Sequence, residues 1–181
     1  SKVLYPYVND GEGLPFNFTD IFAKISYNAR TGSKVNLFGF SFNDQVTYQS
    51  VSNYKWNSFG VGTNVLIVPQ GSQVLLEPYF NYSNYKISLD EDGLPGRTSA
   101  IGGSNGGMNF TYYLGKSELK FGPFLQGFQT KYEFTNSKGT RIGDNEPEST
   151  TDFGVFAKFK WSYKDKIVLE PSFRLHYYAS L

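Results

Sequence analysis

The sequence predicts an all-β fold, an antiparallel up-and-down (meander) β-barrel with about eight strands in this chain. Long segments alternate aromatic or β-branched residues with polar ones, which is the period of a β-strand, and helix signals are nearly absent. Clusters of glycine, proline, asparagine and aspartate separate these segments, as turns do. These observations together indicate neighbouring strands joined by hairpin connections.

The predicted connections alternate in length along the chain. Short turns are expected at residues 28–33, 69–72, 115–117 and 163–166, and long polar loops at 49–55, 90–103 and 135–150. Because successive connections of a meander lie at opposite ends of the sheet, the short turns fall at one end and the long loops at the other. This asymmetry is typical of outer-membrane β-barrels, which have short periplasmic turns and longer extracellular loops.

Eight strands follow from the alternation between these connections. In chain order they cover residues 18–27, 34–48, 56–68, 74–89, 104–114, 118–134, 150–161 and 167–178. Several are much longer than the roughly five or six residues of an average globular strand. A tilted strand needs about 9–11 residues to cross a bilayer, so their length favours a transmembrane barrel. Residues 1–15 are expected to be a linker or loop, and 16–181 the antiparallel barrel or barrel segment.

Alternation within the strands predicts two faces of different polarity. In the last strand Phe173 and Leu175 share one face, and Arg174 and His176 share the other. A polar inside and an apolar outside fit a wide, water-filled barrel. A soluble sandwich gives the same alternation with the faces reversed, so the pattern alone leaves both architectures open.

Aromatic residues mark two further features of the predicted strands. One face of the second strand carries Phe38, Phe40 and Phe42. Aromatic residues also cluster near strand ends, as the girdle of a transmembrane barrel does, at Trp161, Tyr163, Tyr177 and Tyr178. Aromatic residues are good strand formers in any sheet, which is the alternative explanation for this cluster.

Composition excludes several classes of function. Cysteine is absent, so no disulfide or thiolate metal site can form, and His176 is the single histidine. The net charge of +1 comes from dispersed residues, so no nucleic-acid partner is expected. No nucleophile–base set or cofactor motif stands out, so we expect neither an enzyme nor a cofactor. No run approaches the roughly 18 apolar residues of a transmembrane helix.

Charged residues on the polar face are the candidate ligand or lumen residues. They are Glu77, Lys158, Lys160, Glu170, Arg174 and His176. Inside a barrel they would pair with one another, with water or with a plug domain. Structural charge pairing on a wet wall is the simpler interpretation, and contact with a transported substrate is the alternative.

The chain from about residue 14 onward resembles the barrel strands of TonB-dependent outer-membrane receptors of the Bacteroidetes. The resemblance lies in aromatic and glycine patterns at residues 16–28, 32–40, 56–60, 65–71, 85–89, 119–122, 168–174 and 177–181. It implies a barrel of about 22 strands closed around a plug. It also implies energy-driven transport through a TonB partner, with iron chelates, cobalamin, glycans or peptides as substrates.

The chain departs from this family pattern in its extent. It starts abruptly at Ser1, without a signal peptide, and lacks a plug domain, a TonB box and an N-terminal carboxypeptidase-like domain. We therefore expect a barrel segment in the cell outer membrane, with membrane lipid as its partner and with TonB and plug belonging to a full-length parent. Unpaired edge strands also predict self-association.

Two alternatives remain open from the sequence. One is a soluble eight-stranded barrel or sandwich that binds a small apolar or sugar ligand. The other is a self-contained eight-stranded outer-membrane protein. The first would be a monomer without detergent, and the second would close completely within this chain.

Overall fold

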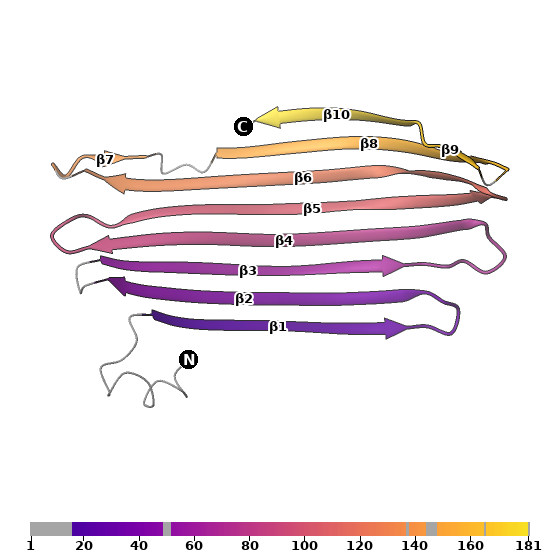
Figure 1. The fold of residues 1–181 in the computed structure, drawn as a ribbon. Coiled ribbons are helices and arrows are strands. Elements are labelled where there is room, and N and C mark those ends of the chain that lie inside the picture. Colours follow the sequence, from indigo (N-terminus) through magenta and orange to yellow (C-terminus); the bar gives the residue numbers. More distant parts are fainter. Residues whose placement is uncertain (1–15, 49–51, 137, 144–147, 165, 181) are drawn as a thin grey trace.

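The computed structural model describes residues 16–48, 52–136, 138–143, 148–164 and 166–180. These residues form one layer of antiparallel strands (Figure 1). The strands are β1 (Phe16–Asn28), β2 (Lys34–Tyr48), β3 (Ser52–Leu66), β4 (Val74–Glu91), β5 (Arg97–Leu114), β6 (Ser117–Thr135), β7 (Arg141–Ile142), β8 (Glu148–Tyr163), β9 (Ile167–Leu169) and β10 (Ser172–Ser180). The linker expected at residues 1–15 lies outside the described part of the chain.

The order of the strands confirms the predicted meander. The sheet runs β1-β2-β3-β4-β5-β6-β8-β10, with β7 paired to β6 and β9 paired to β8. Each main strand therefore lies beside its neighbour in the chain, and every pairing is antiparallel. Within the described residues β1 and β10 have no second partner strand, so the sheet is open, with one edge at each of these strands.

The short turns lie at one end of the sheet, as expected (right in Figure 1). Gly32 and Gly71 have φ values of 87° and 71°, a left-handed conformation that glycine adopts without the steric cost of a Cβ. The turn after β1 is closed by a hydrogen bond from the Gly32 N–H to the Ala29 carbonyl oxygen (3.1 Å). Tight turns of this kind leave little chain beyond the sheet at this end.

At the opposite end of the sheet, the prediction of a long loop is wrong for two of the three segments. Most of the segment 49–55 belongs to β3, which begins at Ser52, and most of 90–103 belongs to β4 and β5. Polar residues led to the prediction of loops in these segments, but the strands continue through them. Ser88 of β4, for example, pairs with Thr98 of β5, with their hydroxyl oxygens 3.4 Å apart. Only the connection between β6 and β8 stays long, and it contains β7.

Strand pairing sorts the side chains onto two faces, because residues directly opposite each other point the same way. The apolar face carries Ile21, Ile25, Val35, Leu37, Phe59, Val61, Leu76, Phe80, Tyr82, Phe110, Phe121, Leu125, Phe153, Val155, Phe159, Trp161, Phe173, Leu175 and Tyr177. The polar face carries Asp20, Lys24, Asp44, Asn64, Glu77, Asn81, Asn105, Lys120, Gln126, Asp152, Lys158, Arg174 and His176.

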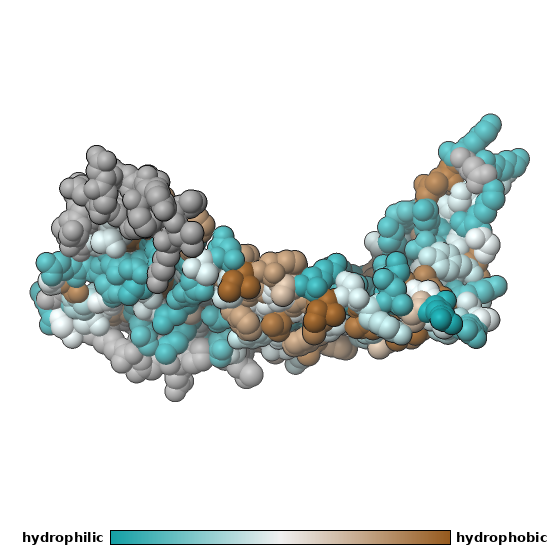
Figure 2. Space-filling view, turned by 90° about the horizontal axis from the view of Figure 1, so that it is seen from below, coloured by the Kyte–Doolittle hydropathy of each residue, from teal (hydrophilic) through white to brown (hydrophobic). Residues whose placement is uncertain are grey.

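No hydrophobic side chain of the described residues is buried. On the apolar face Ile25 is 71% exposed and Leu125 is 53% exposed. The apolar stripe of β8 runs from Phe153 to Trp161, which matches the roughly 9–11 residues needed for a tilted crossing. Figure 2 shows hydrophobic residues gathered over the middle of the sheet and hydrophilic residues at both ends. The sheet therefore has an apolar band across its middle and polar residues at both ends.

The polar face also carries large aromatic rings, and these lie over glycines. Phe38, Phe40 and Phe42 share one face, as predicted, and it is the polar face. A Cβ atom added at Gly60 would lie 2.6 Å from the Phe40 ring, so only glycine leaves room for that ring. The Phe124 ring covers Gly154 in the same way. These rings therefore cover the backbone at positions where glycine has no side chain of its own.

Candidate functional site

All six candidate residues from the sequence lie on the polar face, but they form two groups. Glu77, Lys158, Lys160 and Glu170 lie toward the short-turn end of the sheet. Arg174 and His176 lie farther along β10, opposite Phe156 and Gly154 of β8. The structure therefore does not gather the six residues into one site.

Residues of the first group form ion pairs with other charged side chains of the polar face. The Lys120 Nζ atom lies 3.3 Å from the Glu77 Oε2 atom, which bridges β6 and β4 across β5. Lys158 pairs with Glu170, and Lys160 lies directly opposite Glu118. We call these six residues, Glu77, Glu118, Lys120, Lys158, Lys160 and Glu170, the turn-end charge cluster. Its three lysines and three glutamates balance, and five of them surround a hollow of about 280 Å³.

The second group surrounds the ring of Phe124. The Arg174 guanidinium lies 5.2 Å from the centre of this ring, and the His176 ring lies edge-to-face with it, with 5.3 Å between the ring centres. The His176 Nδ1 atom also lies 3.1 Å from both carboxylate oxygens of Asp152. Both candidate side chains are therefore engaged with neighbouring residues of the wall, which fits a structural role.

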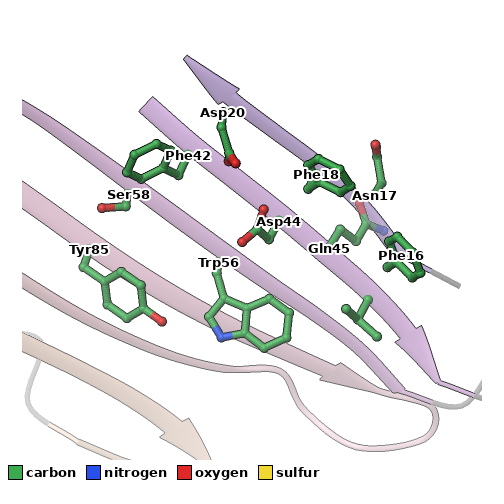
Figure 3. A pocket seen from close by; sticks show the side chains of 11 residues that line it. Phe16, Asn17, Phe18, Asp20, Phe42, Asp44, Gln45, Trp56, Ser58 and Tyr85 are labelled. Carbon is green, nitrogen blue, oxygen red and sulfur yellow. The ribbon is translucent and has the colours of Figure 1, made fainter. Parts of the chain in front are cut away.

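A larger hollow lies on the polar face near the opposite end, where sequence reasoning placed no site. It measures about 810 Å³ and lies over β1 to β4 (Figure 3). We call it the loop-end hollow, and its lining residues are Phe16, Asn17, Phe18, Asp20, Phe42, Asp44, Gln45, Val46, Trp56, Ser58 and Tyr85. Five of these side chains are aromatic and two are carboxylates.

Strand pairing explains how these side chains meet. Phe18, Asp44 and Trp56 lie directly opposite one another on three successive strands, and Asp20 lies opposite Phe42. Figure 3 shows both carboxylates among the surrounding rings. The signal was present in the sequence as the phase of Phe42 and Asp44, but the site depends on the register of four strands, which no single strand reveals.

Within the described residues, Asp20 and Asp44 make no ion pair and no side-chain hydrogen bond. The carboxylates of the nearby loop end differ in this respect. Asp90 pairs with Lys55 at 3.7 Å, and Glu91 pairs with Arg97 at 3.5 Å. The hollow therefore holds two carboxylates that the described part of the wall leaves uncompensated.

The described residues contain no group of three or more His, Cys, Asp or Glu side chains that could hold a metal ion. None of the described segments is a helix long and apolar enough to cross a membrane.

Comparison with known proteins adds information at the level of the fold. No protein-family model and no curated protein matches the chain. Among solved structures, the chain is similar to the FrpB iron transporter from Neisseria meningitidis, with a TM-score of 0.70 and 13% identity over 94% of this chain. It is also similar to the copper transporter OprC, with a TM-score of 0.68 and 10% identity over 92% of this chain.

A third similar structure is the Serratia marcescens hemophore receptor HasR in complex with its hemophore HasA and heme. The TM-score is 0.62, with 10% identity over 90% of this chain. The chain covers 33% of FrpB, 29% of OprC and 25% of HasR. At these identities the similarity shows the fold alone. The eight main strands of this chain are arranged like a segment of each of these larger proteins.

Proposed function

We propose that residues 16–181 form part of the β-barrel wall of a TonB-dependent transporter or receptor in the outer membrane, which takes up a nutrient ligand without catalysis. The observation that carries this proposal is the exposed apolar face, which is tall enough to cross a bilayer. Among the described residues, no hydrophobic side chain is buried behind it. The similarity in fold to two transporters and a receptor supports it.

The energetics of the apolar face favour lipid as its environment. Each large apolar side chain gains about 1.5–3 kcal/mol when it is removed from water. Soluble monomers rarely expose apolar patches larger than a few hundred Å². In this sheet, exposed apolar side chains occur on every main strand, and they include Phe173 (66% exposed) and Leu175 (60% exposed). Hydrocarbon around this face removes the unfavourable contact with water.

The two open edges place a further demand on the assembly. In a bilayer each unpaired backbone N–H or C=O costs several kcal/mol, so open sheet edges do not persist there. β1 and β10 must therefore pair with each other, with a second copy or with further strands. We propose that they pair with further strands of one larger barrel, because the similar structures are about three to four times longer than the segment they share with this chain. This larger barrel would enclose a plug and work with a TonB partner.

A test of this proposal is to fold the purified 181-residue chain in detergent micelles and in phosphatidylcholine vesicles. Because the chain alone leaves two edges open, we expect copies to pair through these edges in detergent and in vesicles. The folded protein should then give a heat-modifiable band in gel electrophoresis, float with the vesicles and precipitate once detergent is removed. Size-exclusion chromatography with light scattering then reports whether the edges pair between copies. A monodisperse monomer in buffer without detergent would contradict the proposal, because its apolar face would have to be buried inside.

A further inference from the structure

We propose that the loop-end hollow binds an organic cation, a ligand that presents guanidinium or ammonium groups. The inference names the ligand class of the transport function proposed above and therefore rests on it. Asp20 and Asp44 supply the charge for such a ligand, and the surrounding rings supply faces on which a cation can lie.

The two carboxylates are close neighbours on one face. Asp20 lies opposite Phe42, and Asp44 follows two residues later on the same strand. Diagonal neighbours of this kind lie roughly 7–8 Å apart in an antiparallel sheet. This spacing lets one extended ligand with two cationic groups contact both carboxylates.

The neighbouring cations leave these carboxylates uncompensated. Lys24 is the next cation along β1 on the same face, but four residues of extended chain, roughly 13 Å, separate it from Asp20. Lys55 lies on the opposite face and pairs with Asp90, and Arg97 pairs with Glu91. The hollow therefore carries net negative charge in the described part of the sheet.

Aromatic rings surround these charges on neighbouring strands. Trp56 lies directly opposite Asp44, and its ring stacks on Tyr54 at 5.8 Å. On the other side of Asp44, Phe18 stacks on Phe16 at 6.4 Å. Cations bind to the faces of such rings, and a planar guanidinium also stacks on them. The combination of two carboxylates and several ring faces favours a cation over a neutral sugar, which needs no negative charge, and over an anion, which the carboxylates repel.

The chain offers a direct probe of this hollow. Its two tryptophans are Trp56, which lines the hollow, and Trp161, which lies on the apolar face near the short turns. In the variant Trp161→Phe, fluorescence therefore reports on Trp56 alone. The folded variant in non-ionic detergent is titrated with a tetra-arginine peptide, with tetra-glutamate and with maltotetraose. We expect a saturable change in emission with tetra-arginine only.

Charge variants then locate the binding. In the Trp161→Phe background, the double substitution Asp20→Asn and Asp44→Asn should raise the dissociation constant for tetra-arginine about tenfold or more. The matched control replaces Glu77→Gln and Glu118→Gln, which changes the net charge equally but at the turn-end charge cluster, and it should leave binding within about twofold. The pair Asp20→Glu and Asp44→Glu keeps the charge and should retain binding.

Three results would overturn the inference. They are the absence of a saturable response to tetra-arginine, an equal loss of binding in both double-neutral variants, and saturation by maltotetraose that is insensitive to Asp20 and Asp44. Heat-modifiable migration of each variant shows that it is folded. The binding result is thus separate from the test of membrane insertion. The proposal of a cation site can therefore be contradicted while the proposal of a membrane-inserted barrel is supported.

Discussion

The two faces of the sheet contain similar aromatic side chains in different surroundings. On the apolar face the Phe80 ring, which is 50% exposed, lies opposite Thr63 and Gly106, and a Cβ atom added at Gly106 would lie 3.4 Å from it, an ordinary contact. On the polar face Phe40 lies over Gly60, and Phe124 lies over Gly154 beside Arg174 and His176. Phe40 and Phe124 thus occupy the space that a Cβ atom would need at the glycine opposite, whereas Phe80 leaves that space open at Gly106.

This difference shows that aromatic content alone does not identify the lipid-facing side of a sheet. Phe38, Phe40 and Phe42 form as hydrophobic a row as any on the apolar face, but their cross-strand neighbours include Gly60, Gly62 and polar residues. The identity of the facing residue on the next strand decides the surroundings of a ring. Variants that exchange or disturb these surroundings therefore test the assignment of the two faces.

The largest effect is expected from a charge on the apolar face. Leu125 and Gln126 are adjacent on β6 and point to opposite faces. In vesicles Leu125→Lys should lower the free energy of unfolding by about 2–4 kcal/mol, because the lysine would have to enter hydrocarbon. Gln126→Lys should change it by less than about 0.5 kcal/mol. Urea unfolding in vesicles measures both, and equal losses would remove the distinction between the faces.

A smaller effect is expected from filling the space beneath a ring on the polar face. Gly60→Ala should lower the free energy of unfolding by about 1–2 kcal/mol, because the new Cβ would meet the Phe40 ring at 2.6 Å. Gly127→Ala is the matched substitution on the apolar face, where the nearest atom would be the Ser104 hydroxyl oxygen at 3.5 Å. It should cause no loss of stability.

A second variant makes this experiment specific to the ring. If the Phe40 ring is responsible, Phe40→Leu should reduce the cost of Gly60→Ala in a double-mutant cycle. A cost that is independent of residue 40 would contradict the role of the ring and assign the cost to the Tyr82 carbonyl oxygen, which would lie 3.2 Å from the same Cβ atom.

The smallest effect is expected at the turn-end charge cluster. Glu77 and Lys120 have side chains that are 40% and 36% exposed, so solvent screens their interaction. The coupling free energy from Glu77→Gln and Lys120→Met should be about 0.2–1 kcal/mol and should fall in high salt. A coupling of several kcal/mol that is insensitive to salt would mean that this cluster is shielded from water, contrary to a wet wall.

The sequence predicted the meander because each strand carries its own signal. Alternation and turn residues are local features, and they located all eight main strands. The last one, expected at 167–178, is divided into β9 and β10. The lengths of the connections were harder to predict, since polar residues such as Asn53 and Thr98 occur in loops and also in strand segments that extend past the apolar band. Only pairing with the next strand distinguishes these two situations.

The same reasoning applies to the candidate sites. The charges near the C-terminus were visible in the alternation of two strands, and the structure places them on one face with partners nearby. The loop-end hollow requires Phe18, Asp44 and Trp56 to come into register on three successive strands. Composition and periodicity contain no information on register, so this site could not be predicted without the fold.

The two tryptophans test most directly whether the apolar face contacts lipid and the polar face does not. Trp161 lies on the apolar face and Trp56 on the polar face. Single-tryptophan variants, Trp56→Phe and Trp161→Phe, are folded into vesicles of phosphatidylcholine brominated near the headgroup. We expect the bromines to quench Trp161 strongly and Trp56 weakly. Equal quenching of both tryptophans, or stronger quenching of Trp56, would contradict the assignment of the faces.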